Sequence, residues 1–136
     1  MILFAYGSLR PGYWNARHFL EDEGLVSIGP ATTADNFQLY VQNGNVPCAV
    51  FGGSTPLIGD LWDIPAPLVE VIHRLESGYK RSTIIVKNAK GEEIVASIYY
   101  VNHPEDSPYS GDQDILVKSG DFKDAVSPRG ELLIKR

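Results

Sequence analysis

The sequence predicts an α+β fold in which a small, mixed, barrel-like sheet carries one main helix. Three observations support this prediction. Many short segments have the alternation or apolar character of strands, and turn signals rich in glycine separate them. Only residues 65–76 show a clear helical pattern. Strands and helices also do not alternate regularly, as they would in a series of βαβ units.

The N-terminal part begins with a short apolar run, Ile2–Tyr6, which Gly7 closes. A buried strand is expected there, and residues 8–12 are expected to form a loop. Residues 13–23 have room for one or two helical turns. Gly24 would end them, because glycine is favoured just after the last helical turn.

The middle of the chain predicts a series of strands. Asn43-Gly44 is typical of a hairpin turn, and Gly52-Gly53-Ser54 is a second turn signal. The strands expected around these turns are residues 25–34, with a kink at Gly29-Pro30, and residues 37–41, 46–51 and 57–64.

The clearest helix is predicted over residues 65–76. Pro65 or Pro67 suits its first turn, and Ser77-Gly78 would stop it. Its apolar residues recur at helical spacing, which predicts that one face is buried. These residues are Leu68, Val71, Ile72 and Leu75.

The C-terminal part predicts two more strands, residues 82–87 and 93–101, joined by a hairpin turn. A polar loop over residues 102–113 follows. The remainder is weakly patterned, with a helical turn expected near residues 122–125. We interpret the whole chain, residues 1–136, as one domain, because this length suits a single core.

Composition and charge narrow the classes of function. The net charge of −5 argues against a nucleic-acid partner, which would require a basic face. No segment approaches the roughly 20 apolar residues of a membrane span, and no secretory leader is recognised. The one cysteine, Cys48, cannot form an internal disulfide and lies in an apolar run. We therefore expect a cytoplasmic protein without a membrane partner.

Two places in the sequence are candidates for chemistry. The first is Tyr6-Gly7-Ser8-Leu9, at the end of the first strand. Glycine there permits a sharp turn and close approach of a ligand, and successive N–H groups of such a turn can bind an anion or a carbonyl oxygen. The alternative is a turn without a ligand.

The second candidate is Glu76, which continues an apolar helical face four residues after Ile72. A carboxylate there would be buried, and burial raises its pKa toward the range of a general acid or base at neutral pH. The alternative is a residue at a frayed helix end that turns to water or pairs with Lys80 or Arg81.

These segments resemble the gamma-glutamylcyclotransferase-like family. Residues 4–9, Phe-Ala-Tyr-Gly-Ser-Leu, resemble its N-terminal strand and loop, and residues 75–81 resemble its segment Leu-x-x-x-Glu-Gly-x-x-Tyr-x-Arg. Further matching positions, in the family's order, are Pro47, Gly59 and residues 119–122. The chain departs from the pattern at His73, where an aspartate is frequent, at Gly78, which follows the glutamate one residue late, and at Phe122, where tryptophan is common.

The resemblance implies the family's fold and the cyclisation of a gamma-glutamyl amine or peptide to 5-oxoproline, with release of the amine. Glu76 would then be the general acid and base, and residues 6–9 would bind the substrate. The reaction is an intramolecular acyl transfer, so no cofactor and no metal is expected. His18, His73 and His103 also lack the spacing of metal ligands.

Four more residues are weaker candidates. Arg10 would attract a substrate carboxylate or extend into water. Tyr79 would pack over the pocket or cap the helix, and Tyr109 would close over the substrate. His73, one helical turn before Glu76, would hydrogen-bond the carboxyl group or lie at the surface.

Two alternative functions stay open at this point. One is an enzyme of the same fold that removes a gamma-glutamyl protecting group in biosynthesis. The other is an inactive relative that binds a small molecule.

Overall fold

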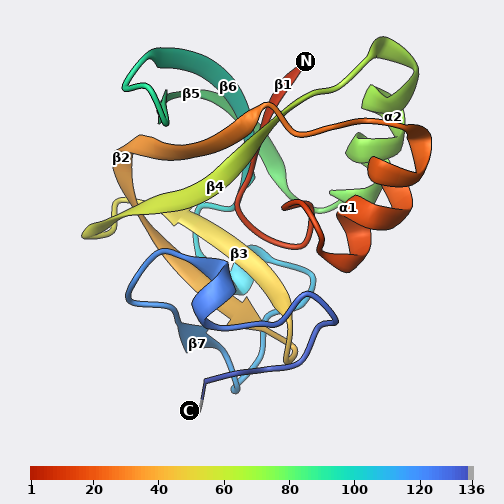
Figure 1. Cartoon of the computed structure of the whole chain (residues 1–136). Coiled ribbons are helices and arrows are strands. Elements are labelled where there is room, and N and C mark those ends of the chain that lie inside the picture. The colour runs from red at the N-terminus through yellow and green to blue at the C-terminus, as the bar shows by residue number, and fades with distance from the viewer. Residues whose placement is uncertain (135–136) are drawn as a thin grey trace.

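The computed structural model describes residues 1–134 (Figure 1). Its elements follow in chain order as β1 (Ile2–Ala5), α1 (Trp14–Phe19), the 3₁₀ turn η1 (Glu21–Glu23), β2 (Gly29–Gln42), β3 (Val46–Phe51), β4 (Thr55–Asp63), α2 (Ala66–Leu75), β5 (Lys80–Asn88), β6 (Glu93–Tyr100), η2 (Pro104–Asp106), β7 (Ile115–Leu116) and η3 (Phe122–Asp124).

Five strands close into a barrel in the order β2-β4-β1-β6-β5, because β5 pairs with β2 as well as with β6. The strand pairs are antiparallel except for β1 and β6, which run parallel. The barrel-like α+β prediction is therefore confirmed. None of the helices within residues 1–134 has the length and apolar character that a membrane-spanning helix requires.

Strand β2 differs from the prediction, which divided it into residues 25–34 and 37–41. It is one strand of 14 residues, and residues 25–28 lie outside it. The pairing of β2 with β4 shifts register between Thr32 and Asn36, and this irregularity coincides with the polar run that suggested a break. There the Thr33 hydroxyl donates to Asp35 O and accepts from the N–H of Leu57, which satisfies the disrupted ladder.

The two halves of β2 have different partners. Its first half pairs with β4 and β5 and belongs to the barrel. Its second half still pairs with β4 at Asn36 and Phe37, and it pairs with β3 and β7 farther along. This second half therefore extends below the barrel in Figure 1, where the C-terminal segment crosses it. The short strand β7 was not predicted, whereas the turn η3 agrees with the helical turn expected near residues 122–125.

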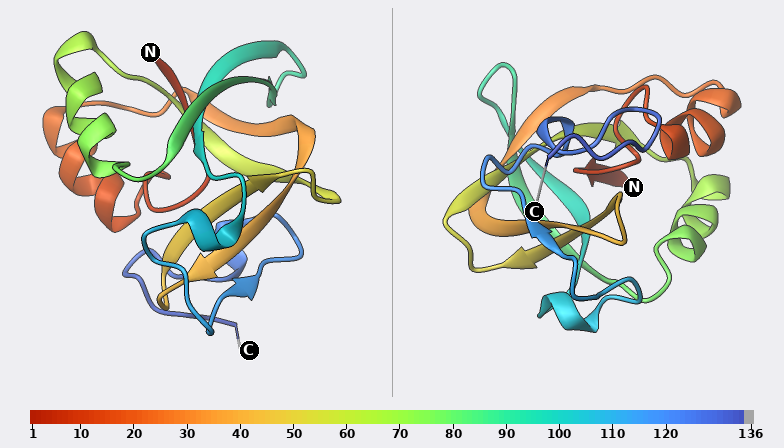
Figure 2. Two further views of the ribbon diagram at one scale, coloured as in Figure 1. Left: turned by 180° about the vertical axis from the view of Figure 1, so that it is seen from behind. Right: turned by 90° about the horizontal axis from the view of Figure 1, so that it is seen from below.

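Strand β1 divides two apolar clusters because its side chains alternate. Phe4 belongs to the cluster inside the barrel, together with Leu57 and Leu61 of β4. Leu3 and Ala5 belong to the cluster between the barrel and the helices. Both helices lie on one flank of the barrel in all views (Figures 1 and 2). Strand β1 is thus covered on both faces, and its C-terminal end is held firmly.

Helix α2 has the predicted position, with Pro65 as its N-cap and Glu76 as its C-cap. Ile72 is fully buried against the barrel, and Leu68 and Leu75 pack beside it. Val71, which the stripe included, instead lines a surface groove with Phe19. After the helix, Gly78 takes the left-handed conformation (φ 94°) and turns the chain into β5.

Candidate active site

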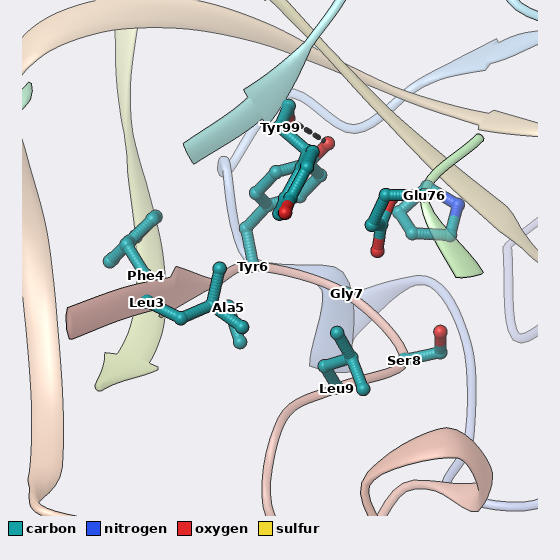
Figure 3. Close-up of a pocket in the computed structure, with 10 residues that line it drawn as sticks. Leu3, Phe4, Ala5, Tyr6, Gly7, Ser8, Leu9, Glu76 and Tyr99 are labelled. Carbon is teal, nitrogen blue, oxygen red and sulfur yellow. Dashed lines mark hydrogen bonds between the residues drawn. The ribbon is translucent and has the colours of Figure 1, made fainter. Parts of the chain in front are cut away.

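The C-terminal ends of β1 and α2 lie side by side at one pocket, although β2, β3 and β4 come between them in the sequence. Glu76 points toward the turn at Gly7 and Ser8 (Figure 3). The pocket between them, which we call the inner pocket, combines the first strand and its turn with three residues from elsewhere. Its lining residues are Leu3, Phe4, Ala5, Tyr6, Gly7, Ser8, Leu9, Pro47, Glu76 and Tyr99.

The turn after β1 is held through its carbonyl groups. Gly7 O accepts from the N–H of Arg10 at 2.9 Å, and Ser8 O accepts from the N–H of Ala16 at 3.1 Å. Leu9 O accepts from the indole N–H of Trp62 at 2.8 Å. In contrast, the N–H groups of Gly7, Ser8 and Leu9 donate to no group of residues 1–134. Buried N–H groups are rarely left unpaired, so this turn has free donors for a ligand.

Gly7 is required by the space around it. A Cβ atom on Gly7 would lie 2.2 Å from Cγ of Pro47, which lines the same pocket. The residue does not have the positive φ of many turn glycines. The structural reason for glycine at this position is therefore contact with Pro47, and not the sharp turn that the sequence suggested.

Ser8 is oriented by Asn15, a residue that the sequence did not single out. Nδ2 of Asn15 donates to Oγ of Ser8 at 2.8 Å. The serine hydroxyl thus accepts from Asn15 and keeps its own hydrogen for another acceptor. Asn15 lies on α1, and nothing in its local pattern indicates this contact.

Glu76 is half-buried, and its carboxyl group makes no hydrogen bond or ion pair with any residue of the described chain. Burial raises its pKa from 4.5 to about 7, because the charged form loses hydration that nothing replaces. Neither Lys80 nor Arg81 pairs with it. The alternative of a salt-bridged helix end is therefore contradicted, and a proton can bind or leave this group near neutral pH.

Three tyrosines surround the carboxyl group. The Tyr6 hydroxyl donates to Tyr99 O at 2.6 Å, a contact drawn as a dashed line in Figure 3. The Tyr79 hydroxyl lies 3.2 Å from Oγ of Ser107. Burial raises the pKa of Tyr79 and of Tyr99 to about 12, so both hydroxyls stay neutral. Tyr99 was missed in the sequence, because it looks like an ordinary strand aromatic.

A second pocket adjoins the first and shares Ser8, Pro47 and Glu76 with it. We call it the outer pocket, and it is the larger of the two. It includes Tyr79 and Tyr109, two of the weaker candidates. Its lining residues are Ser8, Trp14, Asn15, Asn45, Val46, Pro47, Leu75, Glu76, Tyr79 and Tyr109.

Arg10 has neither of the two environments considered for it. Its guanidinium group is buried and bonds Asp60 at 2.9 Å and Asp121 at 2.6 Å. It lines neither pocket and is not extended into water. The expectation of a substrate-binding arginine was wrong because partners distant in the sequence bind this side chain.

His73 also lines neither pocket. Its Nδ1 atom is bonded to the Tyr99 hydroxyl, and its Nε2 atom lies 3.3 Å from Nη1 of Arg81. It reaches the site only through Tyr99, and no direct bond to Glu76 is present. Within residues 1–134, no group of three or more histidine, cysteine, aspartate or glutamate side chains is arranged to hold a metal ion.

Comparison with known proteins agrees with this architecture. The family model described as gamma-glutamyl cyclotransferase, AIG2-like, matches residues 3–124. The chain is 30% identical over 126 residues to a Methanocaldococcus jannaschii protein named "Putative gamma-glutamylcyclotransferase MJ1514", covering 90% of this chain and 95% of that protein.

Two solved structures have the same fold. An uncharacterised protein from Pyrococcus horikoshii is 23% identical with a TM-score of 0.65, and the match covers 91% of each chain. An AIG2-like protein from Mus musculus is 21% identical with a TM-score of 0.64, and the match covers 80% of this chain and 84% of that one. On the family match and the archaeal relative together, this chain belongs to the AIG2-like gamma-glutamyl cyclotransferase family.

Proposed function

We propose that this protein cyclises the gamma-glutamyl group of a small amide to 5-oxoproline and releases the amine. One observation carries the proposal. A carboxyl group with a pKa of about 7 faces a turn that has three unpaired backbone N–H groups. Membership of the cyclotransferase family supports the same reaction.

The substrate carries its own nucleophile. Its α-amino nitrogen attacks the γ-carbonyl carbon and closes a five-membered ring, and the bond from that carbon to the leaving nitrogen then breaks. Folding the substrate in the inner pocket supplies the orientation, which is worth about 7–11 kcal/mol in well-oriented intramolecular reactions. Neither water nor an oxidant is consumed, so the atoms balance without a co-reactant.

Glu76 moves the proton. An α-amino group has a reference pKa of about 8, so a base must take a proton before or during attack. A carboxylate with a pKa of about 7 can accept this proton and return it to the departing nitrogen. The same group therefore acts first as base and then as acid.

The turn at Gly7, Ser8 and Leu9 supplies the electrostatic part. Its unpaired N–H groups bind the oxyanion of the tetrahedral intermediate or the α-carboxylate of the substrate. One oxyanion donor is typically worth about 3–4 kcal/mol to a transition state. The Ser8 hydroxyl, oriented by Asn15, adds a further donor.

The test is release of 5-oxoproline from a panel of gamma-glutamyl amines, gamma-glutamyl dipeptides and glutathione. Turnover of at least one compound by the wild type is expected, and Glu76→Gln should turn over the same compound about 10²–10⁴-fold more slowly. A protein that only binds a small molecule would release no 5-oxoproline from any compound. A biosynthetic enzyme of the same fold would turn over only the amide of its own product.

A further inference from the structure

A cavity outside the candidate active site lies where the start of β4 and the segment after β7 approach β2. We call it the junction cavity. None of the residues that line it belongs to the lining of the inner or the outer pocket. Its volume is about 320 Å³. Pockets that bind small molecules in proteins measure roughly 300–1,000 Å³, so this cavity has room for a small ligand.

The junction cavity results from two strands that share one edge of β2. Phe37 and Tyr40 of β2 each pair with β3 on one side, so their partners on the other side lie on a common edge. Thr55 of β4 lies opposite Phe37, and Leu116 of β7 lies opposite Tyr40. The chain after Leu116 runs toward Thr55 and turns away from β2 there, with the Thr55 hydroxyl bonded to Lys118 O at 3.3 Å. The cavity lies at this junction.

Several hydrogen-bond donors around the cavity have no partner. Within residues 1–134, Lys118 forms no ion pair and the Ser54 hydroxyl forms no hydrogen bond. Oε1 of Gln38 accepts from the Tyr40 hydroxyl at 3.3 Å, and Nε2 of Gln38 donates to no described group. The main-chain N–H groups of Ser54 and Lys118 also donate to no group of that part of the chain. These donors are therefore available to a ligand that carries acceptor atoms.

The charge at the cavity restricts the ligand further. Lys118 is the one charged side chain in the lining, and no aspartate or glutamate lines the cavity, although the net charge of the protein is −5. A single ammonium group balances one negative charge, whereas a phosphate dianion would keep an unbalanced charge. A carboxylate has two oxygens that can accept from an ammonium, a hydroxyl and an amide group together.

The rest of the lining is mostly apolar. Phe37, Leu116 and Val117 contribute to it, and an apolar ligand body gains free energy when such contacts remove it from water. We propose that the junction cavity binds a small monocarboxylate with a short apolar body, whose carboxylate group lies at Lys118 and Ser54. This site is separate from the proposed cyclisation, and its test does not depend on that reaction.

Phenylacetate is a suitable probe, because it joins one carboxylate to one ring. In a titration of the full chain followed by ¹H–¹⁵N NMR, we expect saturable shifts at Gln38, Ser54 and Lys118, with a Kd on the order of 1 mM. Phenylacetamide has the same ring without the charge and should bind at least about five-fold more weakly. Shifts confined to the turn at residues 7–9, or no saturable shift up to about 10 mM, would overturn the proposal.

A charge variant tests the role of Lys118. Lys118→Met should weaken phenylacetate binding at least about five-fold and leave phenylacetamide binding unchanged, because the ammonium group contacts only the charged probe. Lys90→Met removes the same charge from an exposed position in the β5–β6 turn, outside the cavity, and should leave both Kd values unchanged. Position 118 is exposed as well, so folding should persist in both variants.

Two results would contradict the assignment. Equal Kd values for phenylacetate in Lys118→Met and Lys90→Met would show that Lys118 does not bind the carboxylate. Inorganic phosphate that binds at the same residues more tightly than phenylacetate would show that the site does not select a monocarboxylate.

Discussion

At the scale of single residues, two features define the candidate site: the environment of the Glu76 carboxyl group and the space around Gly7. Glu76 is taken partly out of water and is given no partner among the described residues, so its proton affinity rises. Gly7 leaves space for Pro47, since a Cβ atom at position 7 would lie 2.2 Å from Cγ of Pro47. Each feature leads to a variant with a defined outcome.

Glu76→Gln is expected to reduce turnover by about 10²–10⁴-fold, the usual contribution of a general acid or base. The amide has nearly the volume of the carboxyl group, so folding and much of the substrate binding should persist. The measurement is kcat for 5-oxoproline release, with binding followed by calorimetry. Glu70→Gln, at an exposed position of the same helix, is the matched control and should keep its activity. A residual rate above a tenth of wild type would exclude Glu76 as the base.

The rate should also report the titration of Glu76. Because its pKa lies near 7, kcat/KM should rise with pH and level off above an acid limb close to pH 7. His73→Asp adds a like charge and should move this limb upward. The movement should be less than about one pH unit, since Tyr99 lies between position 73 and the pocket. A profile that is flat from pH 5 to 8 in both proteins would contradict a titrating Glu76.

Gly7→Val should damage catalysis much more than Ser8→Ala. A side chain at position 7 must displace Pro47, which lines both pockets, whereas loss of the Ser8 hydroxyl leaves the backbone donors in place. We expect a loss of at least about 10²-fold in kcat/KM for Gly7→Val and less than 10-fold for Ser8→Ala. Gly111→Val, where nothing lies within 4 Å of the new Cβ, is the control. Small, equal losses at positions 7 and 8 would disprove the role proposed for the backbone N–H groups of this turn.

At the scale of elements, Arg10 ties together three parts of the chain. It follows the turn at Gly7, Ser8 and Leu9, and its partners Asp60 and Asp121 belong to β4 and to the N-cap of η3. Tyr13 continues this tie, since its hydroxyl donates to Val126 O at 2.6 Å. The position of the turn therefore depends on the C-terminal segment.

Arg10→Met should lower the free energy of unfolding by about 3–5 kcal/mol, because it leaves two carboxylates in the protein without their cation. Urea unfolding of wild type and variant gives this difference. Arg17→Met changes an exposed arginine on α1 and should cost less than about 0.5 kcal/mol. Similar losses for the two variants would mean that the Arg10 ion pairs contribute little.

At the scale of the whole molecule, the closed barrel positions two parts of the candidate site: the turn after β1 and Tyr99 on β6. Strand β1 pairs with β4 and β6, and the β5–β6 hairpin returns to β2, so the strand before the turn and the strand that carries Tyr99 both belong to the closed sheet. Rigid surroundings are what keep an unpaired carboxyl group in place. Holding the ionised Glu76 carboxylate without a partner should lower the free energy of unfolding of the whole protein.

Stability should fall as the pH rises through the titration of Glu76. The folded state holds this proton more tightly than the unfolded chain, whose ordinary value is 4.5, so the stabilisation is complete below pH 4.5 and is lost as the pH approaches about 7. Glu76→Gln has no carboxyl group to ionise, so it does not lose stability in this way. It should be more stable than wild type at pH 8 by up to about 3 kcal/mol, with water in the pocket reducing the figure.

Urea unfolding at pH 4.5 and pH 8 measures this effect, and Glu70→Gln again serves as the control. The difference between Glu76→Gln and wild type should nearly vanish at the lower pH. A Glu76→Gln variant that is less stable than wild type at pH 8 would show that the ionised carboxylate has a stabilising partner.

Much of this protein was determined by its sequence alone. Apolar alternation and turn residues located most strands, and the spacing of Leu68, Ile72 and Leu75 located α2, because these signals are local and depend on the period of the element. Glu76 and the turn at Gly7 could be found in the same way. A carboxylate on an apolar helical face and a glycine directly after a buried strand can each be recognised from the few residues around them.

The tertiary structure alone decided the rest. Closure of the barrel through β2 and β5, the partners of Arg10 at 50 and 111 residues' distance, and the arrival of Pro47, Asn15 and Tyr99 beside Glu76 have no local signal. Periodicity shows which face of an element is buried, but not which element covers it. The continuous course of β2 was missed for the same reason: its polar residues resemble a turn until the bonds made by Thr33 are seen.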